Sequence, residues 1–528
     1  MAQRFLSLAR ATVMLVVLVL PWIWPFATGP TPSVLPWLAT LACACIWTLL
    51  SRRGPGTSKH QIALAWTVAA LVSSGIGLLQ YLGASTGLQP WINLTQAGEA
   101  FGNLRQRNQF ATLTNMGLAA LLWWPPRADS TTPPRPMDGS QQLWWRLAAI
   151  AMLAVGNATS NSRTGILQLL LLVLVAVLWR RGSERSIGVM LGVAVAVYVA
   201  AALALPMLLG LGPLDGGVAG RFRSDGLVCG SRMTMWGNVL HLIAERPLAG
   251  WGWRELDYAH FMAVYPGMRF CEILDNAHNF PLHLAVELGL PIAAVVCTVL
   301  TWIVWRSRPW READTTRRMA WAVVAVIVLH SLLEYPLWYG PFQLALGLCV
   351  WMLWVSRPAP EVRPAAPSTH AGALVGRINL PKTRPFINGL VCFALLLASY
   401  AAWDYWRVSQ IYLTPERRAV AYMDNTLQKI SGSWLFADQL RFARLLTTEL
   451  RPENAAEIHA LAIGLLHFSP EARVVEKVME SAVMLGRDDE AIDYLIRYRV
   501  AFPKEHSVWS SANRAIAPLG KTGPTASQ

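Results

Sequence analysis

The sequence predicts an all-α membrane protein: a bundle of about eleven transmembrane helices, a large external loop and a C-terminal external helical domain. Three observations lead to this fold class. Of the 528 residues, 54% are hydrophobic and only 14% are charged. The apolar residues gather in runs of about 17–25, the length at which a helix crosses a hydrocarbon layer of ~30 Å. Open sheets are excluded from that layer, because their backbone groups would lack hydrogen-bond partners.

The apolar runs place the predicted spans in chain order. The first run resembles a signal peptide, but no small-residue cleavage site follows it and further spans come after, so we expect it to be retained. The fifth run is short and has the weakest pattern. The predicted spans cover 7–27, 33–50, 62–82, 108–124, 146–158, 163–179, 187–210, 280–305, 319–337, 341–356 and 386–403.

The distribution of charge predicts the orientation of these spans. A net charge of +14 would also fit a nucleic-acid partner, but the basic residues gather in alternate loops, as the positive-inside rule requires. These loops lie near 52–59, 127–146, 180–185, 306–318 and 357–384. The pattern puts the N-terminus in the cytoplasm, and the loop 211–279 and the C-terminus outside. No nucleic-acid partner is therefore expected.

The tail beyond the last span differs from the membrane domain. Helical spacing of apolar residues recurs over 455–467, 471–485 and 488–500, with Pro470 and Gly486 between the runs. The stretch from Gly486 to Tyr494 is typical of a tetratricopeptide-like helical hairpin. The sequence thus predicts a membrane domain over 1–403, which includes the external loop 211–279, and an external helical domain over 404–528.

Two of the seven cysteines, Cys229 and Cys271, fall in the external loop. An oxidising exterior favours a disulfide between them, which would staple the loop. The alternative is two free, partly buried thiols, because sequence alone does not give the geometry that a disulfide needs. The other five cysteines lie in apolar spans and are expected to pack as small hydrophobic residues.

The segment from Asp275 to Pro281 carries the leading candidate for chemistry. His278 lies where the external loop meets an apolar helix; Asp275, Asn276 or Asn279 can cap that helix, and Pro281 fits only its first turn. The partial positive charge of a helix N-terminus favours a neutral imidazole, the form that a general base requires. The alternative is a histidine that anchors the helix at the membrane interface.

Arginines in the external segments are candidates for anion binding. Arg163 lies in a tight external turn, and Arg221, Arg223 and Arg232 lie in the external loop. Arginine offers two parallel donors to a phosphate group, so together they can hold a diphosphate. The alternatives are a solvated interface residue for Arg163 and a loop attracted to anionic lipid head groups for the other three.

Polar residues within the spans add further candidates. Asn108 opens the fourth span, and Glu287 lies nine residues after His278. His330 and Glu334 are four residues apart on one helix face and can pair with each other.

No pattern of histidines, cysteines or carboxylates has the spacing of a metal site, so a transferase here is expected to need no metal or other cofactor.

Several stretches of the chain resemble the bacterial protein O-oligosaccharyltransferases, the pilin-glycosylation ligases of the PglL type, which are related to the O-antigen ligases and polymerases. The Asp275–Gly289 stretch is shared with the O-antigen ligases. The stretches Leu333–Trp338 and Val408–Tyr412, with the external tail, favour the protein ligases. The full set is Gly102–Ala111, Ser160–Gly165, Ser231–Arg232 with Trp236, Arg246–Gly252, Asp275–Gly289, His330–Tyr339 and Asp404–Tyr412.

The resemblance implies an enzyme that transfers an oligosaccharide en bloc from a polyprenyl-diphosphate carrier, such as undecaprenyl diphosphate, to Ser or Thr hydroxyls of exported proteins such as pilins. It implies a multi-pass protein of the bacterial inner membrane, with the site and the C-terminus in the periplasm. Direct displacement would invert the anomeric configuration. No metal is expected to take part, and the lipid-linked oligosaccharide is a substrate.

Residue roles follow from the same resemblance. His278 becomes the general base, and Arg163 and Arg232 bind the diphosphate. Our mechanistic hypothesis adds roles beyond the resemblance: Gln106 and Asn108 line the donor pocket, Asp275 or Asn279 orients the imidazole, and Tyr335 and Glu287 support the site. Arg105 departs from the family pattern, where a small residue is expected before Gln106.

Other functions remain open at this point. An O-antigen ligase acting on lipid A-core, or an O-antigen polymerase, uses the same chemistry with a different acceptor. A flippase or transporter is a second class, but no internal repeat is visible and the ionisable residues gather at the outer rim. A third class is a scaffold that recruits partners through its helical tail.

Overall fold

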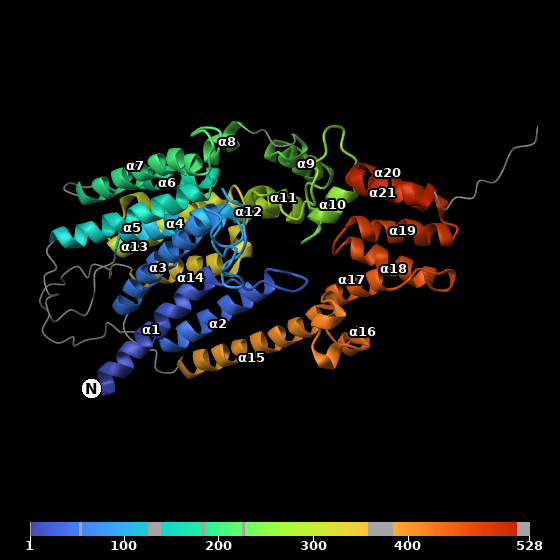
Figure 1. Ribbon diagram of the computed structural model, residues 1–528, viewed down its shortest axis with the longest axis horizontal. Helices are drawn as coiled ribbons and strands as arrows, with labels where there is room; N and C mark the ends of the chain where they lie inside the picture. Colours follow the sequence, from blue (N-terminus) through green and yellow to red (C-terminus); the bar gives the residue numbers. More distant parts are fainter. Residues whose placement is uncertain are drawn as a thin grey trace, which may run out of the picture. The chain divides into compact units, whose positions relative to one another are not determined.

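A computed structural model describes residues 2–51, 55–124, 139–180, 185–223, 228–356 and 384–514. Every regular element in these ranges is a helix, in agreement with the predicted all-α class (Figure 1). The chain divides into two compact units. The first unit comprises Met1–Asp225, His278–Phe280 and Thr298–Tyr405, and the second comprises Gly226–Ala277, Pro281–Cys297 and Trp406–Gln528.

The first unit is a bundle of apolar helices around α4, in which every residue from Gln109 to Leu122 is buried (Figure 1). Helices α3, α5, α6 and α13 pack against it. A Cβ atom on Gly117 of α4 would lie 2.5 Å from the Cβ of Ala70, so glycine permits the close approach of α3. The helices that open this unit are α1 (Ala2–Ile23), α2 (Val34–Leu50), α3 (Pro55–Tyr81), α4 (Arg107–Leu122), α5 (Gly139–Thr159), α6 (Arg163–Leu178), α7 (Arg185–Leu208) and α8 (Gly217–Arg223).

The later helices of the first unit follow the external loop. They are the second half of α12 (Leu290–Ser307), η2 (Pro309–Arg311), α13 (Thr315–Ser331), η3 (Pro336–Trp338), α14 (Gly340–Val355) and most of α15 (Arg384–Ser409). Four helical stretches of the described residues are long and apolar enough to cross a membrane: Ser58–Tyr81, Arg185–Leu208, Leu290–Arg311 and Pro385–Tyr412. Four shorter apolar helices accompany them. The membrane character is therefore clear, and the count of eleven spans stays a prediction.

Two predicted spans differ from the helices that form. The span over 280–305 is broken into α11 (Phe280–Leu288) and α12, because Gly289 has a φ of 84° and lies against the backbone of Leu248. The span over 319–337 ends at Ser331 instead, because Pro336 disfavours helical backbone at the residue before it and offers no N–H to a continued helix.

The segment from Pro247 to Gly252 holds the break between α11 and α12. The N–H groups of Trp251 and Gly252 donate to the carbonyls of Val286 and Glu287, each at 2.9 Å. The N–H of Leu290 donates to the carbonyl of Pro247 at 2.8 Å. The first two bonds satisfy carbonyls that α11 leaves open at its C-terminal end, and the third satisfies an N–H that α12 leaves open at its N-terminal end.

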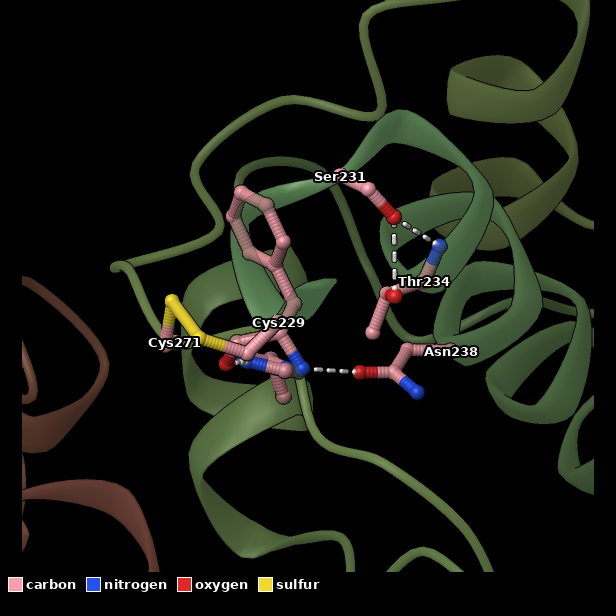
Figure 2. Close-up of a disulfide and its surroundings, with 7 residues drawn as sticks. Cys229, Ser231, Thr234, Asn238 and Cys271 are labelled. Carbon is pink, nitrogen blue, oxygen red and sulfur yellow. Dashed lines mark hydrogen bonds between the residues drawn. A yellow bond between two sulfur atoms is a disulfide. The ribbon is translucent and has the colours of Figure 1, made fainter. Parts of the chain in front are cut away.

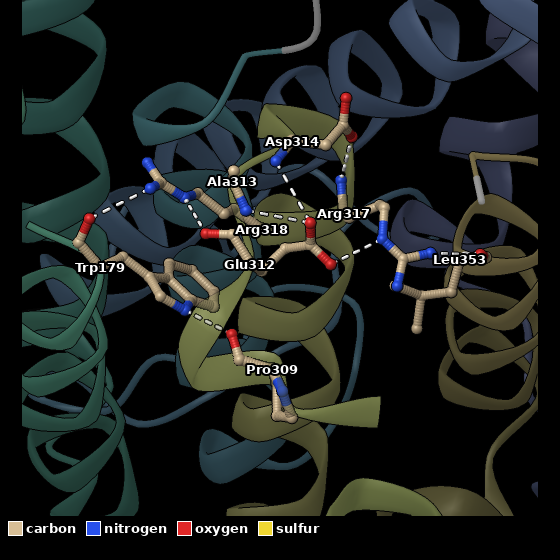
Figure 3. A network of polar contacts seen from close by, with 8 residues as sticks. All are labelled: Trp179, Pro309, Glu312, Ala313, Asp314, Arg317, Arg318 and Leu353. Carbon is tan, nitrogen blue, oxygen red and sulfur yellow. Dashed lines mark hydrogen bonds and ion pairs between the residues drawn. The ribbon is translucent and has the colours of Figure 1, made fainter. Parts of the chain in front are cut away.

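A network of polar contacts joins helix ends around the start of α13 (Figure 3). Arg318 is 3% exposed and donates to the carbonyls of Glu312 at 2.9 Å and Trp179 at 3.1 Å. Arg317 binds the Glu312 carboxylate at 2.6 Å and donates to the carbonyl of Leu353 at the same distance. This network ties the ends of α6, α13 and α14 to the connection before α13.

In the second unit the external loop and the C-terminal helices share one core. Phe261 of α10 (Leu256–Met262) is buried with residues of the C-terminal helices, and its ring stacks on Tyr494 at 6.4 Å. Arg497 donates to the carbonyl of Met262 at 3.1 Å. The other helices of this unit are η1 (Val228–Gly230), α9 (Arg232–Glu245), η4 (Gln410–Tyr412), η5 (Pro415–Arg417), η6 (Val420–Tyr422), α16 (Thr426–Ile430), α17 (Ala437–Thr447), η7 (Pro452–Asn454), α18 (Ala455–Leu466), α19 (Ala472–Met484), α20 (Asp488–Ala501) and α21 (Pro503–Arg514).

Cys229 and Cys271 form a disulfide beside the start of α9 (Figure 2). Ser231 caps this helix by accepting a hydrogen bond from the N–H of Thr234 at 3.1 Å. Asn238 of the same helix accepts from the N–H of Phe270 at 2.7 Å. The disulfide and the asparagine thus fasten the segment before Asp275 to α9.

Candidate functional site

His278 occupies a constrained position at the end of the external loop. Its φ is 49°, a left-handed conformation that is uncommon for residues other than glycine. The neighbouring Asn279 donates from Nδ2 to the carbonyl of Leu332 at 3.1 Å. Pro281 lies in the first turn of α11, as the sequence predicts. The imidazole keeps 27% of its surface exposed, so a substrate can reach it.

The carboxylate of Glu334 is the partner of this imidazole. Its Oε2 lies 2.7 Å from Nδ1 of His278, and its side chain is only 10% exposed. The ring of Tyr335 meets the imidazole edge to face, with 4.9 Å between ring centres. The predicted supporting role of Tyr335 is therefore consistent with its position. Asn279 donates to the backbone carbonyl of Leu332, and its role as an orienting group stays a prediction.

Asn108 and Ser162 extend this contact into the bundle. Asn108 donates from Nδ2 to Oε1 of Glu334 at 3.0 Å. The hydroxyl of Ser162 donates to Oδ1 of Asn108 at 2.6 Å and accepts from the N–H of Gly165 at 3.0 Å. Ser162 is therefore the N-cap of α6 and is linked to His278 through two intermediate side chains.

A second group of polar side chains lies deeper between the same helices. Nδ1 of His330 lies 2.9 Å from Oγ1 of Thr112, which accepts a hydrogen bond from Gln168 at 2.8 Å. Asn115 donates to Oε1 of Gln168 at 3.2 Å. His330 is fully buried. His330 thus contacts Thr112 and Glu334 contacts His278, and the predicted pairing of His330 with Glu334 stays a prediction.

Two of the predicted arginines, Arg163 and Arg221, adjoin or contact the turn before α6. Arg163 is the first residue of α6 and is exposed. Arg221 of α8 donates to the carbonyl of Asn161 in the same turn at 3.1 Å. A helix N-terminus that carries arginines is a suitable site for an anion. Arg232 is the first residue of α9 in the second unit. Arg223 ends α8, and its side chain lies outside the described part of the chain.

The remaining predicted site residues have separate surroundings. Gln106 is the N-cap of α4, where its side chain accepts from the N–H of Gln109 at 2.7 Å. Asp275 is exposed in the second unit. Glu287 is 1% exposed in α11, and its carboxylate lies 3.6 Å from Nε2 of His283.

Two buried ionisable groups of the loop have shifted pKa values. Burial, helped by the charge of Arg269, lowers the pKa of His260 to about 3, so this histidine is neutral. Its Nδ1 lies 2.7 Å from the hydroxyl of Tyr265. Burial, with smaller contributions from Asp275 and Glu255, raises the pKa of Asp257 to about 7. These shifts reflect a packed loop that excludes water from polar side chains.

Sequence reasoning missed the roles of Glu334 and Ser162 in this site. Glu334 was visible as a carboxylate at the external end of a span, but helical periodicity paired it with His330. Because α13 ends at Ser331, the three residues that follow turn the Glu334 side chain toward His278. One sequence feature indicates the contact of Glu334 with His278: the carboxylate lies just before Pro336, where a helix is expected to have ended.

Comparison with known proteins gives three family matches. A protein glycosylation ligase family matches residues 100–124. An O-antigen ligase family matches 147–297, and the C-terminal family of virulence factor membrane-bound polymerases matches 318–517. The chain is related to the protein glycosylation ligases and O-antigen ligases. The resemblance found in the sequence is therefore confirmed.

A curated relative extends this result. The general O-oligosaccharyltransferase of Acinetobacter baylyi (strain ATCC 33305 / BD413 / ADP1) is 24% identical over 307 residues, which cover 56% of this chain. The match spans 50% of the relative's own length. His278 falls within the O-antigen ligase match, and Glu334 falls within the polymerase match.

Proposed function

We propose that this chain is a protein O-oligosaccharyltransferase that moves a glycan from a polyprenyl-diphosphate carrier to Ser or Thr hydroxyls of exported proteins. One observation carries the proposal: His278, with a carboxylate on Nδ1, is linked through Asn108 and Ser162 to the arginine-bearing turn before α6. A base and an anion-binding turn are the two parts that this reaction requires. The relationship to a general O-oligosaccharyltransferase supports the same reaction class.

In the proposed reaction, Nε2 of His278 takes the proton of the acceptor hydroxyl as its oxygen attacks the anomeric carbon. The bond from that carbon to the diphosphate breaks, and the leaving diphosphate takes the electron pair. General-base assistance of this kind contributes roughly 10²–10⁴-fold. Arg163, Arg221 and Arg232 stabilise the charge that develops on the diphosphate. A single displacement inverts the anomeric configuration.

The proposed setting is the bacterial inner membrane, with His278 and the C-terminal helices in the periplasm. The polyprenyl tail stays in the lipid beside the apolar helices, and an exported protein such as a pilin brings the hydroxyl. No metal enters the proposed reaction. A chelator such as EDTA is therefore expected to leave the transfer rate unchanged in a purified assay.

The deciding experiment replaces His278 with alanine and measures transfer to the exported proteins of intact cells by mass spectrometry. We expect transfer to be lost while the protein remains folded in the membrane. Normal glycosylation by a folded H278A protein would overturn the proposal. Arg163→Lys and Arg232→Lys are expected to weaken transfer, since an ammonium group does not reproduce two parallel hydrogen bonds to phosphate.

The O-antigen ligase and polymerase matches favour one second candidate, transfer of the same donor to a glycan acceptor. The acceptor distinguishes the two functions. If deletion of this chain removes sugar from lipopolysaccharide and leaves exported proteins unchanged, the ligase or polymerase reading replaces the proposal.

A further inference from the structure

We infer that Glu334 is a positioning residue for His278, and that Asn108 and Ser162 fix the direction in which it acts. The inference rests on the proposed function and names the group that orients the His278 imidazole and sets its tautomer. The contact between His278 and Glu334 joins Nδ1 to Oε2 at 2.7 Å. Its consequence is an imidazole that carries its proton on Nδ1 and presents Nε2 to the acceptor hydroxyl.

The direction of each hydrogen bond in the chain follows from the chemistry of its ends. At one end, the N–H of Gly165 can only donate, and it donates to the Ser162 hydroxyl at 3.0 Å. At the other end, an ionised carboxylate can only accept. Asn108 must therefore turn Nδ2 toward Glu334, at 3.0 Å, and Oδ1 toward the Ser162 hydroxyl, at 2.6 Å.

Burial makes this direction costly to reverse. Ser162 is fully buried and Asn108 lies between it and a carboxylate that is 10% exposed. If the Asn108 amide were reversed, its Oδ1 would face the carboxylate and the Ser162 hydroxyl would lose its acceptor. A buried polar group left without a partner costs about 1–3 kcal/mol. Glu334 thus receives one hydrogen bond from Asn108 and keeps its second oxygen for His278.

The Glu334→Gln variant tests the inference because it keeps the shape and changes the hydrogen-bond pattern. Nδ2 of Asn108 still requires an acceptor, so the glutamine oxygen turns toward Asn108 and the glutamine NH₂ turns toward His278. Nδ1 must then accept, and the proton moves to Nε2, where it blocks the base. Loss of the orienting carboxylate in serine proteases lowers kcat by about 10⁴, mainly through the wrong tautomer.

For E334Q we expect kcat to fall by about 10²–10⁴, the range of general-base catalysis, with the KM for the donor within about twofold of wild type. The assay uses the purified full chain in detergent. Its substrates are undecaprenyl-diphosphate oligosaccharide extracted from the host membrane and a purified pilin of the host. A purely structural role for Glu334 would instead lower the folded fraction or raise KM.

The double variant Asn108→Asp with Glu334→Gln supplies the rescue. The carboxylate at position 108 accepts from the Ser162 hydroxyl and from the glutamine NH₂, so the glutamine oxygen turns back to accept from Nδ1. The proton returns to Nδ1 although position 334 is neutral. We expect N108D/E334Q to recover at least about tenfold in kcat over E334Q, which corresponds to about 1.4 kcal/mol of transition-state stabilisation.

Four comparisons complete the experiment. Glu457→Gln, which changes an exposed carboxylate that contacts Arg444 in the C-terminal helices, is expected to transfer at the wild-type rate. If H278A transfers normally, the proposed function fails. If H278A is inactive and N108D/E334Q is no better than E334Q, the function stands and the positioning inference is overturned. A wild-type kcat for E334Q overturns it as well.

Discussion

Gly289 lies so close to Leu248 that a Cβ atom built on the glycine would be 2.1 Å from the leucine carbonyl oxygen. The φ of Gly289 is 84°, a conformation that L side chains rarely adopt. Gly250 is equally crowded from the other side, because its Cβ would lie 2.4 Å from the carbonyl oxygen of Glu287. The two glycines let two backbone segments cross at the break between α11 and α12.

The Gly289→Ala variant is therefore expected to be strongly destabilised. A left-handed conformation costs a non-glycine residue about 1–2 kcal/mol, and the overlap with the Leu248 carbonyl adds to it. Thermal unfolding in detergent would measure the loss. Gly464→Ala in α18 is the control, because no atom lies within 4 Å of its added Cβ. Equal unfolding temperatures for the two variants would contradict the role given to the crossing.

Arg318→Lys separates charge from hydrogen bonding in the network of Figure 3. Lysine keeps the positive charge, but one ammonium group does not reach the carbonyls of both Glu312 and Trp179. We expect the free energy of unfolding to fall by about 1–3 kcal/mol, which is the cost of a buried acceptor left without a hydrogen bond. Chemical denaturation of the purified protein would report it.

The exposed Arg306 provides the control for that variant. Arg306→Lys is expected to leave both the topology and the midpoint of unfolding unchanged. If R318K also unfolds at the wild-type midpoint, then Arg318 contributes only its charge and the network is not a source of stability.

The external loop is expected to lose stability on acidification through His260. The pKa of this histidine is about 3 in the folded state and about 6.5 when exposed, so the unfolded state binds the extra proton between these values. The stability that the neutral histidine preserves is present above pH 6.5 and is lost as the pH falls toward 3. In His260→Gln this acid sensitivity should decrease, as measured by hydrogen exchange of residues 256–270 at pH 7 and pH 5.

Asp257 is expected to stabilise the loop on acidification, which is the opposite of the effect of His260. Its pKa is about 7 in the folded state against 3.8 in the reference state, so here the folded state binds the extra proton. Its contribution is present at low pH and is lost as the pH rises through about 7. In Asp257→Asn the loop should therefore become more sensitive to acid than wild type. A shift in the same direction for both variants would show that other groups govern the loop.

Phe261→Ala is expected to loosen the C-terminal helices, although the residue precedes Phe442, the first of their buried core residues, by 181 positions. Phe261 is 2% exposed in their core, and removal of a buried phenylalanine typically costs about 3–5 kcal/mol. Limited proteolysis should then cut within both α10 and α20. The exposed Val508, truncated to alanine, is the comparison. Cleavage confined to α10 would argue against a shared core.

The sequence predicted the helices well where one apolar run forms one helix. The run over 163–179 becomes α6, and the run over 341–356 becomes α14, within one residue at each end. The prediction was wrong where backbone contacts from distant segments decide the outcome. Gly289 breaks its run because Leu248 lies against it, a contact that periodicity does not encode.

The candidate site was only partly accessible to the same reasoning. A histidine at a helix start is recognisable from sequence as a candidate base, since loop–helix junctions and lone ionisable groups are local features. Its contact with Glu334 joins segments 56 positions apart in the chain and depends on α13 ending at Ser331. The helical period favoured His330 as the partner, because pattern analysis assumes that the helix continues.

The shared core of α10 and the C-terminal helices has a consequence for protein engineering. Phe261 and Met262 complete a surface that Tyr494 and Arg497 present from the far end of the chain. A chimaera that exchanges only the tail with that of a relative would join two unmatched halves of one interior. Grafts intended to alter acceptor choice should carry the 226–277 segment and the tail together, as a single unit of exchange.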